Sequence, residues 1–170
     1  MARFGSAWIR HHSRAGRSAT PRLKSLLLAR EALGHAGTGD AAGAVAALRR
    51  ARSLAERPRH DDDPIWLAFY GPADFASHER RVALALNDLA TAEDRARTAL
   101  ALTDPIGYPR NHAQYLVRLA DDLVQRRQID EAVAIAKRAT TAFAAMESPR
   151  VTHALHAVIQ SLAPFKGESL

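Results

Sequence analysis

The stretch RQIDEAVAIAKRA at residues 127–139 decides the fold, because it places two alanines seven residues apart directly after a polar turn. The same spacing follows two other polar turns, at Ala44 and Ala51 and at Ala92 and Ala99. Seven residues make about two turns of an α-helix, so each pair of alanines lies on one helix face. Small side chains there let a neighbouring helix approach closely. The spacing therefore predicts stacked helical hairpins, an architecture that usually binds other molecules.

The composition favours helix and excludes some kinds of chemistry. The 170 residues are rich in alanine, only 6% are aromatic, and there is no cysteine, which excludes disulfides, zinc–thiolate sites and cysteine nucleophiles. No apolar run approaches the roughly 18 residues that a membrane span needs, and the N-terminus lacks the apolar segment of a secretory signal. We therefore expect a cytoplasmic protein with one elongated all-α domain and no membrane contact.

The net charge of +6 belongs to the N-terminal segment. Residues 1–24 contain no acid, and the rest of the chain carries 18 basic and 18 acidic residues. The basic residues of this segment are Arg3, Arg10, Arg14, Arg17, Arg22 and Lys24. We expect residues 1–20 to form a disordered basic tail. Two interpretations of this tail stay open. It contacts nucleic acid or anionic lipid, or it is a solvated leader or an artefact of the choice of start codon.

Turn and cap residues divide residues 21–163 into three hairpins and a terminal helix. Pro21 suits the first turn of a helix that we expect to end at Gly34, and Asp40 is the expected N-cap of its partner, which ends before Pro58. The second hairpin is expected to pair residues 73–86 with 90–103. The third pairs a helix that Asn111 caps with residues 129–145.

Two further segments complete the predicted organisation. Between the first two hairpins, residues 57–72 read as a charged loop followed by a short apolar stretch, in which Trp66 and Phe69 are expected to pack against the neighbouring hairpin. Ser148-Pro149 is a strong helix start, and the helix that follows has one apolar stripe, as expected of a C-terminal capping helix. Residues 164–170 are expected to be a short disordered tail.

These features resemble the tetratricopeptide repeat family, whose unit of roughly 34 residues carries a Gly-Asp turn and alanines seven apart. Gly39-Asp40 with Ala44, and Asp130-Glu131-Ala132 with Ala139, match that pattern. The first-helix signature is weak, and the first alanines of the three pairs lie 48 and 40 residues apart, so the loops between repeats are enlarged. The resemblance implies a right-handed superhelical stack of about three helix-turn-helix hairpins plus the capping helix.

A narrower likeness covers residues 64–162. It is carried by Pro64-Ile65-Trp66, Arg110-Asn111, Tyr115, Leu119-Ala120 and Ser148-Pro149-Arg150-Val151. These residues are similar to the C-terminal repeat region of actinobacterial helix-turn-helix transcriptional regulators. Residues 1–38 offer at most one good helix, too little for a DNA-reading head. The likeness implies the sensor or interaction half of such a regulator, and direct DNA binding by the folded domain is not expected.

Catalytic and metal-binding interpretations fare poorly. Asp121 and Asp122 are adjacent in a helix and point about 100° apart, so they cannot act as a facing catalytic pair. His153 and His156 lack a third ligand at a suitable spacing, and the run from His60 to Asp63 lacks the glycine-containing spacing of a calcium loop. No phosphate-cradling loop or nucleophile motif appears. We expect neither an enzyme nor a bound cofactor or metal.

A binding surface is the better hypothesis. In repeats of the resembled type, the first helix of each hairpin lines the concave surface, which implies contacts from Ser77, His78, Arg81, Gln114, Arg118 and Asp121. Their mixed charge favours a protein or peptide partner over a polyanion. The alternatives are an ordinary solvated face, a nucleic-acid-associated protein that acts through the tail, and a scaffold whose first hairpin forms a homodimer.

Overall fold

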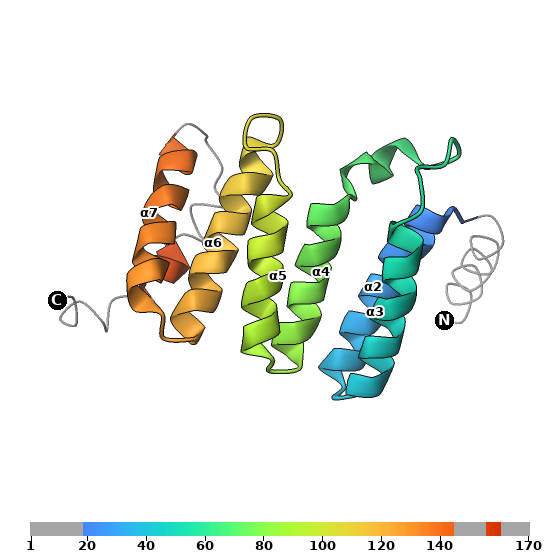
Figure 1. Ribbon diagram of the computed structural model, residues 1–170, viewed down its shortest axis with the longest axis horizontal. Coiled ribbons are helices and arrows are strands. Elements are labelled where there is room, and N and C mark those ends of the chain that lie inside the picture. Colours follow the sequence, from blue (N-terminus) through green and yellow to red (C-terminus); the bar gives the residue numbers. More distant parts are fainter. Residues whose placement is uncertain (1–18, 145–155, 161–170) are drawn as a thin grey trace, which may run out of the picture. The chain divides into compact units, whose positions relative to one another are not determined.

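The computed structural model describes residues 19–144 and 156–160, and every regular element in them is a helix. The elements are α2 (Pro21–Gly37), α3 (Ala41–Ala55), the short 3-10 helix η1 (Ile65–Phe69), α4 (Pro72–Ala85), α5 (Leu89–Ala101), α6 (Pro109–Gln125) and α7 (Ile129–Ala144). Figure 1 shows antiparallel pairing of α2 with α3, α4 with α5, and α6 with α7. The all-α fold is therefore confirmed. The right-handed superhelical stacking of the three hairpins stays a prediction.

One turn geometry recurs in all three pairs. The residue with positive φ is Gly39 (81°), Asn87 (58°) or Arg127 (58°), in each case five residues before the first alanine of the motif. The backbone N–H of the following residue donates at 2.9 Å to the carbonyl five residues earlier, which joins Asp40 to His35, Asp88 to Ala83 and Gln128 to Leu123. This bond satisfies a carbonyl that the end of a helix would otherwise leave unpaired. The repeat is thus present in the backbone as well as in the sequence.

The alanines of the motif occupy the closely packed faces of α3, α5 and α7. None is more than 1% exposed: Ala44, Ala51, Ala92, Ala99, Ala132 and Ala139. In the third hairpin, Ala132 and Ala139 of α7 belong to the same apolar cluster as Leu116, Leu119 and Leu123 of α6. The predicted role of the spacing, a small-residue face against a neighbouring helix, is confirmed.

The chain divides into two compact units, Met1–Gly71 and Pro72–Leu170, which we describe separately. In the first unit, the buried Ser25 hydroxyl on α2 donates to the Ala51 carbonyl on α3 at 2.8 Å. A hydroxyl has one proton, so the Tyr70 hydroxyl, 3.0 Å away, is the donor to Ser25 Oγ. Tyr70 and the fully buried Leu67 thereby hold the segment around η1 against the α2–α3 hairpin.

The packing of that segment differs from the prediction. Trp66 and Phe69 are 59% and 51% exposed, whereas Leu67 and Tyr70 are buried. A 3-10 helix has three residues per turn, so residues 67 and 70 lie on one side of the helix. Residues 66 and 69 lie on another side, about 120° away around the axis. Trp66 and Phe69 therefore face outward.

Two predicted helix ends were also wrong. Helix α2 continues past Gly34 to Gly37, because the left-handed residue that ends it is Gly39. Helix α6 begins at Pro109 after Tyr108, so Asn111 lies in the first turn and is not its N-cap. The turn ahead of α6 is shaped by Asp104, whose carboxylate accepts from the backbone N–H groups of Ile106 and Gly107, both at 2.9 Å.

Several predictions concern residues outside the described ranges. These are the tail residues Arg3, Arg10, Arg14 and Arg17, the Ser148-Pro149 helix start and the 164–170 tail. Of the predicted capping helix, residues 156–160 are described; they are helical, and Val158 is buried in the apolar cluster of α6 and α7. No helix in the described residues is both long and apolar enough to cross a membrane.

Candidate binding face on helices α4 and α6

The six residues predicted to line a binding surface lie on α4 and α6, and contacts join some of them. Arg118 Nη1 donates to Ser77 Oγ at 2.6 Å, and Arg81 is close enough to Arg118 to influence its ionisation. Asp121 lies 3.7 Å from Arg80, a residue the sequence pattern did not single out. His78 and Gln114 are partly buried on the same two helices but take no part in the Ser77–Arg118 contact.

Several contacts cross from α4 to α6, and we call three of them the α4–α6 ladder. The Tyr115 hydroxyl donates to Asp74 at 3.2 Å, Arg118 donates to Ser77, and Arg80 forms an ion pair with Asp122. Residues three or four apart lie on one helix face, which places positions 74, 77 and 80 of α4 opposite 115, 118 and 122 of α6. The ladder fixes the register of the two helices.

The Arg80–Asp122 pair is the buried rung of the ladder. Arg80 Nε and Nη2 each donate to one Asp122 oxygen at 2.6 Å, and the Asp122 side chain is 1% exposed. Burial raises the pKa of the Asp122 carboxyl, and the Arg80 guanidinium opposes that shift. The signal for this pair was present in the sequence: Asp122 falls between Leu119 and Leu123 on the apolar stripe, where a carboxylate needs a partner.

Arg118 is the cation of the ladder that is partly exposed to solvent. Within the described residues it forms no ion pair; its partners are the Ser77 hydroxyl, at 2.6 Å, and the Tyr115 ring, whose centroid lies 5.4 Å from the guanidinium carbon. Burial lowers the pKa of Arg118, and the neighbouring Arg80 and Arg81 add to this shift, whereas Tyr115 and the Asp74 carboxylate partly oppose it. A partly desolvated cation without a paired anion is unfavourable. An acidic group placed beside Arg118 would therefore be stabilised.

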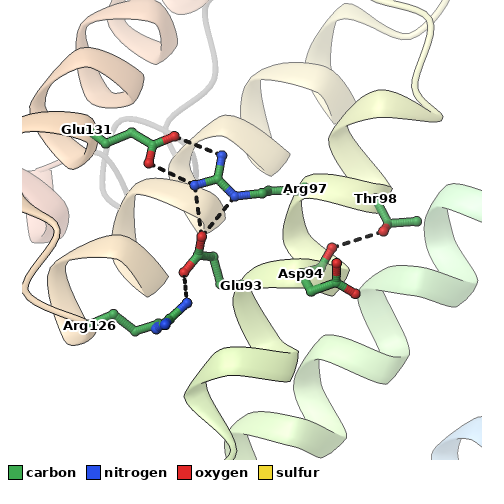
Figure 2. A network of polar contacts seen from close by, with 6 residues as sticks. All are labelled: Glu93, Asp94, Arg97, Thr98, Arg126 and Glu131. Carbon is green, nitrogen blue, oxygen red and sulfur yellow. Dashed lines mark hydrogen bonds and ion pairs between the residues drawn. The ribbon is translucent and has the colours of Figure 1, made fainter.

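A second polar network, shown in Figure 2, contrasts with this arrangement because its charges are matched. Glu93 of α5 is buried and pairs with Arg97 at 2.8 Å and with Arg126. Arg97 also donates two hydrogen bonds of 2.8 Å to Glu131 of α7. These bonds lower the pKa of Glu131. The network ties α5 to α7 and leaves no unmatched cation for a ligand.

The residues that the sequence analysis weighed and rejected as metal ligands lie in two places. In the 60–63 loop, the backbone N–H of Asp62 donates to His60 Nδ1 at 3.1 Å and that of His60 to Asp63 at 3.2 Å. His153 lies outside the described residues, and His156 is exposed on the helical residues 156–160. Nowhere in the described ranges do three or more histidine or acidic side chains gather closely enough to hold a metal ion.

The two described residues of the basic segment have different surroundings. Burial raises the pKa of the Asp63 carboxyl, but hydrogen bonds from the Thr20 side chain and the His60 backbone, with a smaller effect of the nearby Arg22, lower it overall. Lys24 lies beside Arg49 and Arg50 along an open groove of the α2–α3 hairpin.

Comparison of the chain with protein-family models, with curated proteins and with solved structures finds no match. The relationship to tetratricopeptide repeat proteins therefore remains a prediction from the quoted residues.

Proposed function

We propose that this chain is a non-catalytic helical-repeat domain that binds a protein or peptide segment through α4 and α6. The observation that carries the proposal is Arg118, a partly desolvated guanidinium with no ion-paired carboxylate among the described residues. A carboxylate of the partner would supply the missing charge and accept hydrogen bonds from the guanidinium. Arg81, which is exposed on the neighbouring helix α4, would reinforce the preference for an acidic partner.

The ladder makes this face suitable for binding because it is fixed before the partner arrives. Arg118 is held by Ser77 on one side and by the Tyr115 ring on the other, so little conformational entropy is lost when an acidic group binds. The buried Arg80–Asp122 pair beneath it keeps α4 and α6 in register.

The biological setting forms part of the same proposal. The likeness of residues 64–162 to the repeat region of actinobacterial regulators supports a tetratricopeptide-like sensor or interaction domain in a bacterial transcription-regulatory system. A cytoplasmic location agrees with that setting.

Selection of peptides tests this proposal. A display library of random peptides is selected against the full chain, and the affinities of the recovered peptides are measured by fluorescence anisotropy. We expect aspartate and glutamate to be enriched. Arg118→Gln should weaken binding by about tenfold or more, as expected for loss of a hydrogen bond to a charged group.

Arg110→Gln is the matched control, because Arg110 is an exposed arginine near the start of the same helix. It should change the affinity by less than about twofold, as expected for an exposed charge away from the contact. Arg81→Gln provides a second variant that leaves the Ser77–Arg118 contact intact. Peptides that bind Arg118→Gln and Arg81→Gln as tightly as the unmodified chain would refute the assignment of this face.

A further inference from the structure

The first unit carries an open groove that the proposed function does not use. It runs along the α2–α3 hairpin and has a volume of about 630 Å³. Its apolar floor is formed by Leu27, Leu28 and Leu54, of which Leu27 is 45% exposed. A volume of this size accommodates several side chains of a bound segment.

Basic side chains border the floor from both helices. Lys24 lies on α2, and Arg49 and Arg50 lie on α3. In the described part of the chain, none of these three cations has an ion pair. The one carboxylate on the groove, Glu31, is 3.8 Å from His35, one turn further along α2. The groove therefore combines an apolar floor with a surplus of positive charge.

We infer that this groove binds an acidic amphipathic helix of a partner protein. Positions 24, 27, 28 and 31 lie on one face of α2, and positions 50, 53 and 54 lie on one face of α3, so the two helices present a continuous surface to a third. A partner helix would place an apolar stripe on the leucines and its flanking carboxylates beside Lys24, Arg49 and Arg50. This site is separate from α4 and α6.

Charge argues against two other occupants of the groove, the chain's own residues 1–18 and a second copy of the chain, and the shape of the groove argues against a membrane. Residues 1–18 of the chain carry four arginines and no acid, so the three cations would repel them. A second copy packed on the same face around a two-fold axis would bring the same cations together. An anionic membrane would satisfy the charges, but the leucines line a groove, whereas insertion into lipid needs apolar side chains that protrude.

The test uses synthetic peptides and the full chain. The main probe is a fluorescein-labelled peptide of about 18 residues, long enough to become helical, with leucines on one face and glutamates on both flanks. A scrambled peptide of equal composition removes the amphipathic face, a third peptide carries lysines for the glutamates, and a fourth has the sequence of residues 1–18. We expect anisotropy titration to show tight binding of the main probe and at least about tenfold weaker binding of the other three.

Variants then locate the binding. The double variant Arg49→Glu, Arg50→Glu should lower the affinity for the main probe by about tenfold or more, and Leu27→Ser should also lower it. The matched control is Arg30→Glu with Arg59→Glu, which makes the same change in net charge at exposed positions outside the groove. Circular dichroism verifies that each variant is folded. Arg118→Gln should leave this probe unaffected, which separates the test from that of the proposed function.

Five results would overturn the inference. Equal weakening by the control pair, or equal binding of the scrambled peptide, would reduce the effect to net charge. Tighter binding of the 1–18 peptide would assign the groove to the chain's own segment. A dimer in light scattering that Arg49→Glu with Arg50→Glu dissociates would assign it to a second copy. Binding to phosphatidylserine vesicles, lost in the same variant and without binding to the main probe, would assign it to a membrane.

Discussion

Arg127 adopts a left-handed backbone conformation, with φ of 58°, at the turn between α6 and α7. The two equivalent turns place Asn87 and Gly39 at this position, residues that tolerate positive φ better than arginine does. Arg127→Gly should therefore raise the free energy of unfolding by about 0.5–1 kcal/mol. Urea denaturation followed by circular dichroism provides the measurement.

Arg127→Val is the counterpart, because a β-branched side chain is least tolerant of positive φ. It should lower the free energy of unfolding by a similar or larger amount. Equal destabilisation by Arg127→Gly and Arg127→Val would contradict this prediction. It would mean that contacts of the Arg127 side chain stabilise the fold by more than the left-handed backbone conformation destabilises it.

Glu131 should make stability depend on pH in the acidic range. Hydrogen bonds from Arg97 lower the pKa of Glu131 in the folded state, so its stabilising effect is present above its unfolded pKa of about 4.3 and is lost as the pH falls through the folded value. Glu131→Gln should be less stable than the unmodified chain by about 0.5 kcal/mol at pH 7. Urea unfolding midpoints from pH 7 to pH 3 should show this difference disappear.

Glu56→Gln is the control for this series, since Glu56 is exposed and forms no ion pair within the described residues. A difference between Glu131→Gln and the unmodified chain that persists unchanged at pH 3 would mean that the side chain acts through packing.

At the residue scale, the sequence predicted features that depend on a few neighbouring residues. Asp40 caps α3 by accepting from Gly43 N at 2.8 Å, as its position before a helical pattern indicates. The same rule suggested Asn111, but Pro109 can begin a helix without a side-chain cap and does so two residues earlier. Trp66 and Phe69 were misplaced because the handedness and period of a short helix decide which side faces inward.

At the scale of the element, the motif alanines should not tolerate larger side chains. Ala92 of α5 is fully buried, whereas Ala90, in the first turn of the same helix, is exposed. Ala92→Leu should lower the free energy of unfolding by about 1–3 kcal/mol or more through overpacking. Ala90→Leu should change it by less than about 0.5 kcal/mol. Equal effects in thermal or urea unfolding would contradict the close-contact face.

The Arg80–Asp122 pair should behave as one unit that joins α4 to α6. Removing either partner leaves a buried charge unpaired, so Arg80→Ala and Asp122→Ala should each lower the free energy of unfolding by about 3–5 kcal/mol. The double variant should lose clearly less than the two single losses together. A double-mutant cycle by urea unfolding measures this, and additive losses would show that the two charges act independently.

The ladder shows why elements were easier to predict than the contacts between them. The apolar spacing identified α4 and α6, and the resemblance placed Ser77, Arg81, Arg118 and Asp121 on one surface. Whether a polar residue there is free or paired depends on which helix lies opposite, and Arg80 and Asp122 are 42 positions apart in the chain. Local periodicity could indicate that Asp122, on the apolar stripe, needs a partner. It could not identify Arg80 as that partner or show that Arg118 has none, because both facts follow from tertiary packing.

For the whole molecule, the regular alanine spacing predicted three hairpins, and all three are present with one shared turn geometry. The two candidate surfaces lie on different units, α2 with α3 in one and α4 with α6 in the other. Each carries at least one cation that has no ion pair among the described residues, Arg118 on α6 and Lys24, Arg49 and Arg50 along the groove. We therefore expect acidic partner segments to be preferred at each of them, with separate sets of residues responsible.

The central claim is that α4 and α6 bind an acidic peptide segment through Arg118. The most direct measurement is a calorimetric titration of one selected acidic peptide into the full chain, Arg118→Gln and Arg110→Gln. The prediction is a dissociation constant at least about tenfold higher for Arg118→Gln and changed less than about twofold for Arg110→Gln. Equal dissociation constants for Arg118→Gln and the unmodified chain, with both proteins folded, would contradict it.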